Sequence, residues 1–282
     1  AADTLTIGTT THGGAALFAE AVTVPTINIT GANSGDENST ATFNKAVTAT
    51  TIVLDNSGIA GTAKVIFAEN NSVTITGTID GASSDEGTIQ ITGATKTFSG
   101  AIGGTQALTL IDIDGTSIFN AAVSATNIDN DGTATFKSDV TAATANDGTL
   151  TLTPNGDNDI THSGAISGAG ILNAVEADDD AVNSVTFSTT VAAATFNIGS
   201  TTKSGVVILN GDTTVTNLNI YAGNVDAEDS TVTVNGDLDT TTITLDDGTN
   251  SAVTKIIFAD TDTVTISGAI TAATANDGTI QV

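Results

Sequence analysis

The 282-residue chain contains no Cys, Met, Trp or Arg, and it has only one Tyr and two Pro. Without Cys there are no disulfides and no thiol chemistry, so its stability must come from backbone pairing and burial. No apolar run approaches the roughly 20 residues that a membrane-spanning helix needs. Because the first residue is Ala1, we expect a mature or trimmed chain from which any signal peptide has been removed.

Positive charge is also scarce. Six basic residues face 32 acidic ones, and the formal net charge is −26. Such a surface repels nucleic acid, whose phosphates are bound by cationic groups, and it repels anionic lipid headgroups. It attracts divalent cations and favours solubility. We therefore expect no nucleic-acid partner.

Apolar residues alternate with Thr along most of the chain, which predicts half-buried strands. Between these segments lie links rich in Asp, Asn and Gly, which are turn-forming residues. The best helical stretch, Ala15 to Ala21, is too short to stand alone. The sequence therefore predicts an all-β fold. The clearest alternating pairs are Leu5/Ile7, Ile27/Ile29, Ile52/Leu54, Val73/Ile75, Leu150/Leu152, Val232/Val234, Ile243/Leu245 and Val264/Ile266.

An internal repeat organises these strands. Residues 64–91, KVIFAENNSVTITGTIDGASSDEGTIQI, recur as residues 255–282, KIIFADTDTVTISGAITAATANDGTIQV. Other units also begin at a Phe and pass through a polar patch and an apolar pair to a turn. Degenerate repeats of this length cannot bury their own apolar faces, whereas stacked neighbours can, which is typical of a parallel β-solenoid. Tandem Ig-like β-sandwiches are the alternative.

The two repeat copies differ at their C-terminal ends. The first continues into TGATKTFSGAIGG, whereas the second stops at Val282. We expect residues 1–282 to form a single repetitive solenoid that is a segment of a longer chain or a stacking subunit. The two ends of a solenoid expose unpaired strand edges, so we also expect a homo-oligomer or polymer formed through end-to-end or lateral contacts.

Acidic loops are the candidate metal sites. Calcium takes six to eight oxygen ligands, and stacked coils could bring together carboxylates from the Asp-Gly loops and from the cluster at residues 176–180. However, these loops lack EF-hand spacing and the GGxGxD nonapeptide, and Asp-Gly also serves simply as a turn. Calcium binding and turn formation therefore both remain open. The candidate ligands are Asp114, Asp131, Asp147, Asp178, Asp179, Asp180, Asp247 and Asp277.

Catalytic chemistry is hard to build from this sequence. The histidines, His12 and His162, lie in turns far apart along the chain, whereas a triad or a zinc site needs partners close by. We therefore predict that the protein is not an enzyme, with a polysaccharide-active enzyme as a distant alternative. Lysines flank several of the repeat phenylalanines. They could protect strand edges, form salt bridges with the next coil, or form isopeptide crosslinks.

The phrases FNKAVTATTIVLDNSG, TFKSDVTAATANDGT and VILNGDTTVTNLNI resemble repeats of bacterial cell-surface β-solenoid proteins. These include autotransporter passengers of the rickettsial outer-membrane type and S-layer proteins. The resemblance implies an exported protein at the cell surface that acts in a coat, an S-layer or a filament. Its alternative implication is an adhesin or passenger domain that binds a host or neighbouring surface.

Overall fold

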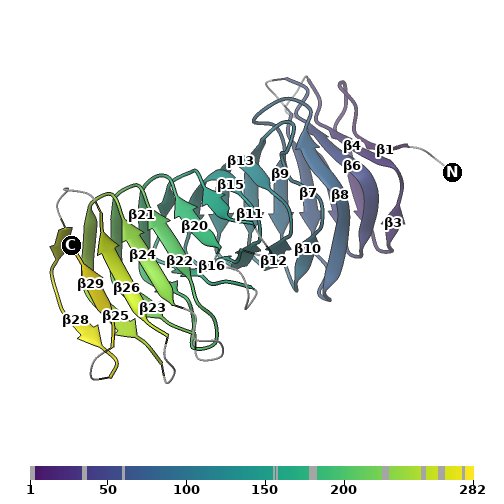
Figure 1. Ribbon diagram of the computed structural model, residues 1–282. Helices are drawn as coiled ribbons and strands as arrows, with labels where there is room; N and C mark the ends of the chain where they lie inside the picture. Colours follow the sequence, from purple (N-terminus) through teal and green to yellow (C-terminus); the bar gives the residue numbers. More distant parts are fainter. Residues whose placement is uncertain are drawn as a thin grey trace. The chain divides into compact units, whose positions relative to one another are not determined.

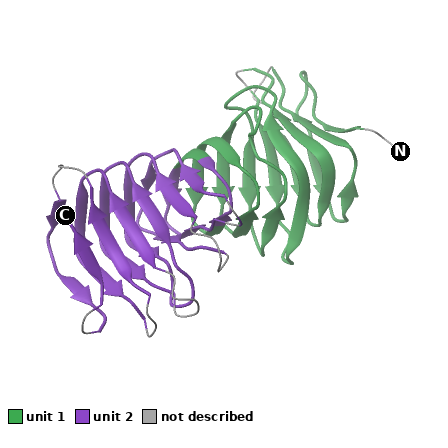
Figure 2. Ribbon diagram, in the orientation of Figure 1, with its two compact units in different colours: residues 1–134, 141–143 green, residues 135–140, 144–282 purple. Residues whose placement is uncertain are grey.

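The computed structural model describes residues 4–33, 37–58, 61–154, 156, 158–177, 183–223, 229–248, 252–259, 264–274 and 277–282. The chain divides into two compact units, shown in Figure 2. Unit 1 comprises residues 1–134 and 141–143, and unit 2 comprises residues 135–140 and 144–282. The described residues are all β with no helix, so none of them forms a helix that could cross a membrane.

The strands succeed one another along the whole chain (Figure 1). Unit 1 contains β1 (Thr4–Ile7), β2 (Ala15–Phe18), β3 (Val22–Thr23), β4 (Thr26–Thr30), β5 (Ser39–Phe43), β6 (Val47–Asp55), β7 (Ala63–Phe67), β8 (Val73–Gly81), β9 (Thr88–Ile91), β10 (Lys96–Phe98), β11 (Leu108–Ile113), β12 (Thr116–Phe119) and β13 (Val123–Asn130). Both units share β14 (Thr133–Phe136) and β15 (Val140–Asn146). Unit 2 continues with β16 (Thr149–Leu152), β17 (Ile160–His162), β18 (Ile166–Ser167), β19 (Ile171–Ala174), β20 (Ser184–Phe187), β21 (Val191–Ile198), β22 (Val206–Leu209), β23 (Thr213–Tyr221), β24 (Ser230–Val234), β25 (Leu238–Asp246), β26 (Thr254–Phe258), β27 (Val264–Ile266), β28 (Ile270–Ala272) and β29 (Thr279–Gln281).

Within unit 1 the strands pair in parallel with those of the next coil and form three ladders. One ladder runs β2–β5–β7–β9–β11–β13. A second runs from β1 through β4 to the second halves of β6 and β8. The third runs from β3 through the first halves of β6 and β8 to β10 and β12. The sequence step between paired residues varies: Leu110 pairs with Asn127, 17 residues on, and Thr51 pairs with Thr78, 27 residues on.

Unit 2 repeats this arrangement. One ladder runs β17–β20–β22–β24–β26–β29. Another runs through β16, β19, β21, β23, β25 and β28. The first halves of β21, β23 and β25 continue to β27 as the third. The long strands β21, β23 and β25 therefore each belong to two ladders.

The alternation seen in the sequence sets which side chains face inward. Ile27, Ile52 and Ile79 occupy one column of the unit 1 core, and each is at most 1% exposed. The intervening Thr residues face outward, because successive side chains of a strand point to opposite faces. Each unit is thus a parallel β-solenoid, as the sequence predicts. The Ig-like sandwich alternative is wrong, because sandwiches are built from antiparallel sheets.

Phenylalanines stack along the axis of unit 1. The ring centroids of Phe18 and Phe43 lie 4.8 Å apart, and those of Phe43 and Phe67 lie 6.0 Å apart. Phe98 stacks on Phe119 at 5.0 Å in a neighbouring ladder. Aromatic pairs at these separations add about 0.5–1.5 kcal/mol beyond the burial of their surface. The repeat phenylalanines therefore hold neighbouring coils together.

Corners of the coils require glycine where backbones approach closely. Gly77 lies within β8, between the residues that belong to two different ladders, and has a φ of +103°. A Cβ atom at this position would collide with the carbonyl oxygen of Ala49 in the preceding coil. Only glycine combines this conformation with this approach.

Candidate functional site

The strongest candidate for a functional surface is the last coil of unit 2, residues 264–282. Its strands β27 and β28 pair with β25 on one side, and β29 pairs with β26. No described strand pairs with their other edge. The apolar side chains that continue the inward columns are open to solvent: Ile270 is 40% exposed and Ile280 is 44% exposed. This coil, which we call the C-terminal edge, presents unpaired backbone groups beside apolar side chains.

The internal repeat shows that the exposure comes from position rather than from sequence. Ile79 and Ile89 of the first repeat copy correspond to Ile270 and Ile280, and they are 1% and 0% exposed. In unit 1 the strands β10 and β11 pair with β8 and β9 and cover them. The C-terminal edge is therefore the surface of a solenoid core that lacks its next coil among the described residues.

The first coil of unit 1, residues 4–23, forms a second unpaired edge. Its strands β1, β2 and β3 pair with β4, β5 and β6, and no described strand pairs with their other side. Leu5, Phe18 and Val22 are half-buried, whereas Ile27, Phe43 and Val47, their counterparts in the next coil, are at most 1% exposed. We call this coil the N-terminal edge.

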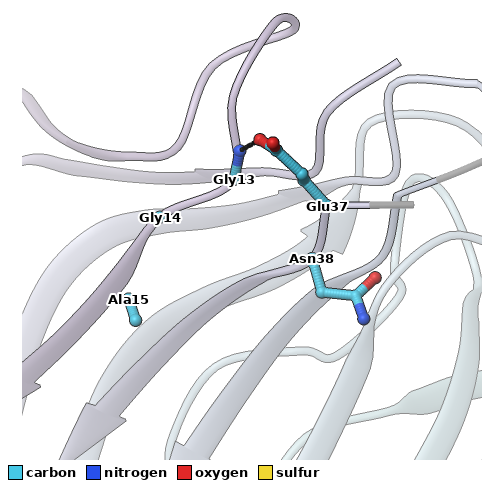
Figure 3. Close-up of a pocket in the computed structure, with 5 residues that line it drawn as sticks. All are labelled: Gly13, Gly14, Ala15, Glu37 and Asn38. Atoms are coloured by element: carbon cyan, nitrogen blue, oxygen red, sulfur yellow. Dashed lines mark hydrogen bonds between the residues drawn. The ribbon is translucent and has the colours of Figure 1, made fainter. Parts of the chain in front are cut away.

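A shallow hollow of about 410 Å³ opens beside the N-terminal edge and is shown in Figure 3. The Glu37 carboxylate accepts a hydrogen bond from the backbone N–H of Gly13 at 2.8 Å. Asn38 accepts hydrogen bonds from the backbone N–H and the hydroxyl of Thr62, at 2.9 and 2.8 Å. The polar groups at this hollow thus serve to tie successive coils together.

Three of the predicted loop aspartates accept hydrogen bonds either within their own coil or from the following coil. Asp147 accepts a hydrogen bond from the N–H of Ala169 at 2.9 Å. Asp247 accepts from both the N–H and the hydroxyl of Thr254 at 2.6 Å and from the N–H of Gly278 at 2.8 Å. Asp277 accepts from the N–H and the hydroxyl of Thr274, at 2.6 and 2.7 Å. Asp80, Asp139, Asp159 and Asp229 likewise accept N–H groups of the following coil.

The structure brings four acidic residues of unit 1 near one another. Asp112 of β11 pairs in register with Asp129 of β13, and Asp114 and Asp131 lie two residues further along, in the turns that follow these strands. Burial raises the pKa of Asp112, and the nearby Asp114 raises it further. Asp114 accepts a hydrogen bond from the side-chain amide of Gln90 at 3.0 Å. The Asp114 carboxylate, one of the groups that calcium would need as a ligand, is thus already hydrogen-bonded within the protein.

The structure leaves the calcium hypothesis open. Within the described ranges, no three acidic, His or Cys side chains are grouped so as to hold a metal ion. Asp178, Asp179 and Asp180 lie outside the described residues. Asp247 and Asp277 lie in adjacent coils, and the carboxylate oxygens of Asp247 already accept backbone N–H groups. Turn formation and coil-to-coil bonding are therefore the uses that the geometry documents.

Two buried polar side chains were not anticipated from the sequence. Lys96 is 0% exposed, and its ammonium group donates to the carbonyl oxygens of Glu69, Thr92 and Ala94 at 2.5, 3.0 and 2.6 Å. Burial lowers its pKa. The signal was available, because Lys96 stands two residues before Phe98 and so shares its inward face.

His162 is the other such group, and it lies in the core of unit 2. Its Nδ1 lies 3.0 Å from the carbonyl oxygen of Gly164, and its Nε2 lies 3.1 Å from the hydroxyl of Thr144. His162 pairs in register with Phe187, and the centroids of the two rings lie 6.2 Å apart. Burial lowers its pKa to about 4, so it is neutral at pH 7. The matching segments Ile-Thr-His-Ser and Val-Thr-Phe-Ser (160–163 and 185–188) could have revealed this core position.

The salt-bridge hypothesis for the lysines is confirmed for Lys45. The Lys45 ammonium group lies 2.7 Å from the Glu69 carboxylate in the loop of the next coil. The hydrogen bond from Lys45 is the main cause that lowers the pKa of Glu69 to about 2, and backbone donation from Asn71 adds to it. This ion pair links successive coils, whereas Lys96 donates to backbone carbonyl oxygens instead.

Unit 2 also carries a ladder of asparagines on its outer face. Asn219 donates to Asn197, and Asn197 donates to Asn173, each at 2.9 Å. A hollow of about 350 Å³ lies over this ladder and is lined by Asn173, Asn197, Ser200, Thr201 and Tyr221, with Val175 and Gly199. None of the described residues that line this hollow is charged, although the chain as a whole is strongly acidic.

No protein-family model matches the chain, and no similar curated protein or solved structure was found.

Proposed function

We propose that this chain is a non-catalytic, structural protein of an extracellular coat or filament, and that it assembles through the edges of its solenoid coils. The observation that carries the proposal is the C-terminal edge, where unpaired strands lie beside solvent-exposed Ile270 and Ile280. Exposed strand edges with apolar side chains favour pairing with another chain. The resemblance to repetitive bacterial surface proteins supports an exported location.

The high negative charge fits this role as a control on assembly. A net charge of −26 keeps separate molecules apart in dilute, low-salt solution, and salt screens that repulsion. Assembly should therefore increase with protein concentration and with ionic strength. The same charge supports the expectation that the protein has no nucleic-acid partner.

Sedimentation velocity and negative-stain electron microscopy of the purified chain test the proposal. We expect regular polymers that grow with concentration and with added NaCl. The control is the double substitution Ile270→Asp and Ile280→Asp, which places charges on exposed positions of the C-terminal edge and should keep the chain monomeric. A wild-type chain that stays monomeric at high concentration and in high salt would overturn the proposal.

An adhesin is the second candidate, and the hollow of unit 2, whose described lining residues are uncharged, favours it. Amides, hydroxyls and the ring of Tyr221 surround this hollow, and such groups suit a neutral polar ligand such as a surface oligosaccharide. Binding to a glycan array would be lost in Tyr221→Ala and retained in the control Thr271→Ala. An array on which the wild-type chain binds no glycan would remove this candidate.

A further inference from the structure

The internal repeat identifies what kind of surface fits the C-terminal edge. In unit 1 the equivalent strands of the first repeat copy are covered by parallel strands in register: Ile75 of β8 lies beside Phe98, and Ile89 of β9 lies beside Ile111. At both of these positions an inward apolar residue meets an inward apolar residue, whereas Val73 of β8 lies beside the buried Lys96. The partner of the C-terminal edge must therefore present parallel strands with apolar residues in the same columns.

The N-terminal edge of the same chain presents such strands. The columns of unit 1 run from Leu5 through Ile27 and Ile52 to Ile79, and Ile79 is the repeat equivalent of Ile270. The column of Ala16 leads to Ile89, the equivalent of Ile280. The column of Val22 leads to Ile75, the equivalent of Ile266.

We propose that the C-terminal edge of one copy binds the N-terminal edge of a second copy as the next coil of the solenoid. Leu5 and Ala16 of one copy then lie beside Ile270 and Ile280 of the other. Val22 follows Ala16 along the coil, so it lies in the column of Ile266 but one coil further away. This inference rests on the proposed structural function and specifies its interface. The contact is head-to-tail, so each copy keeps one free edge, and such contacts generate open filaments unless a rotation closes them.

Charge does not oppose this contact. Residues 4–23 include one formally charged side chain, Glu20, and residues 264–282 include one, Asp277, although the whole chain carries a net charge of −26. Two copies can therefore approach at these edges with less repulsion than the net charge of the whole chain would suggest. Most of the acidic side chains lie elsewhere along the chain, where they disfavour lateral association.

Engineered cysteines test the register without background, because the chain has no Cys. Thr6 and Thr271 are exposed neighbours of Leu5 and Ile270, and the proposed register puts them side by side. Strands in a sheet lie about 4.8 Å apart, which is within the Cα separation of about 4.4–6.8 Å that a disulfide spans. We expect Thr6→Cys and Thr271→Cys copies, mixed and mildly oxidised, to form a disulfide-linked dimer.

The control mixture joins Thr6→Cys with Thr279→Cys, which lies in a different ladder, and it should link much less. A disulfide yield for this mixture equal to that of the Thr6–Thr271 mixture would overturn the register. Polymers visible by electron microscopy without the Thr6–Thr271 link would refute this interface but leave assembly intact. Absence of both polymers and links would refute the proposed function as well.

Blocking each edge separately tests the head-to-tail arrangement. Leu5→Asp leaves only the C-terminal edge free, and Ile270→Asp leaves only the N-terminal edge free. Each variant alone should be monomeric, whereas an equimolar mixture should sediment as a dimer and grow no further. A dimer formed by either variant alone would show a symmetric contact and overturn the proposal. Far-ultraviolet circular dichroism confirms that both variants retain their strands.

Discussion

The two copies of the repeat, residues 64–91 and 255–282, have nearly the same pattern of residues but different surroundings. Ile89 of the first copy is 0% exposed and Ile280 of the second is 44% exposed. Both pair in parallel with the preceding coil, at Val65 and at Ile256. The difference arises because β11 covers the first copy and no described strand covers the second. In a solenoid, whether a repeat residue is buried depends on the coil stacked next to it rather than on its own sequence.

Matched alanine substitutions should reveal the largest difference between the two repeat copies. Ile89→Ala removes a fully buried side chain and should lower the free energy of unfolding by about 2–5 kcal/mol. Ile280→Ala removes an exposed side chain and should cost less than about 1 kcal/mol in the monomer. Urea denaturation at low protein concentration measures both. Equal losses would show that the C-terminal edge is covered in solution.

Acidification should weaken unit 2 through His162. Its pKa falls from 6.5 to about 4 on folding, so the unfolded chain binds a proton between these values while the folded chain does not. The contribution of His162 to the free energy of unfolding is therefore fully present above about pH 6.5 and declines as the pH falls toward 4. Below that pH, about 3 kcal/mol of stability is lost.

Thermal unfolding between pH 7 and pH 4 tests this, with His162→Phe as the variant. Phe is the residue that pairs with this position in the next coil. The variant should lose the part of the pH dependence that His162 supplies, whatever its stability at pH 7. An unchanged slope would show that carboxylates alone control the acid response.

A backbone substitution should instead affect both repeat copies equally. Gly87 and Gly278 are equivalent positions with φ of +83° and +80°, and a Cβ at either would collide with a Leu side chain of the preceding coil, Leu54 or Leu245. Gly87→Ala and Gly278→Ala should each cost about 1–3 kcal/mol. Urea denaturation measures the loss in the free energy of unfolding. A large loss for only one of the two variants would show that the following coil also influences the backbone conformation at this position.

Chelation should have the smallest effect. Backbone N–H groups donate hydrogen bonds to the carboxylates of Asp147, Asp247 and Asp277. Because these oxygens are already bonded within the protein, we expect EDTA to leave the melting temperature unchanged. Calorimetry with EDTA and then with added CaCl₂ measures this. A melting temperature that falls in EDTA and recovers with calcium would establish the calcium sites that the sequence suggested.

The period-two pattern was sufficient to predict the strands, and the internal repeat favoured the solenoid over the sandwich alternative. Pairs such as Ile243 and Leu245 alternate with Thr and both face inward. Even Ala15 to Ala21, the best helical stretch, contains strand β2. Alternation is a local property, so it can be read from the chain without knowledge of the partner strands.

The ladder assignments and the buried polar groups could not be predicted in the same way. Phe67 and Phe98 both begin repeat units, but they lie in different ladders, because coil length varies and shifts the register. Lys96 is tolerated in the interior only because three carbonyl oxygens from loops converge on it. That convergence depends on tertiary positions that no spacing rule encodes, and the same holds for the oxygen sets of the aspartate loops.

The variable coil length has a consequence for how such a chain can change. Steps of 17 and 27 residues both preserve ladder pairing in unit 1, so the additional residues are accommodated at the corners between the paired strands. Long surface insertions cost little, because loop-closure entropy grows slowly with length. Such corners are therefore the places where evolution or an engineer can graft new peptide segments onto the wall of the solenoid without disturbing its core.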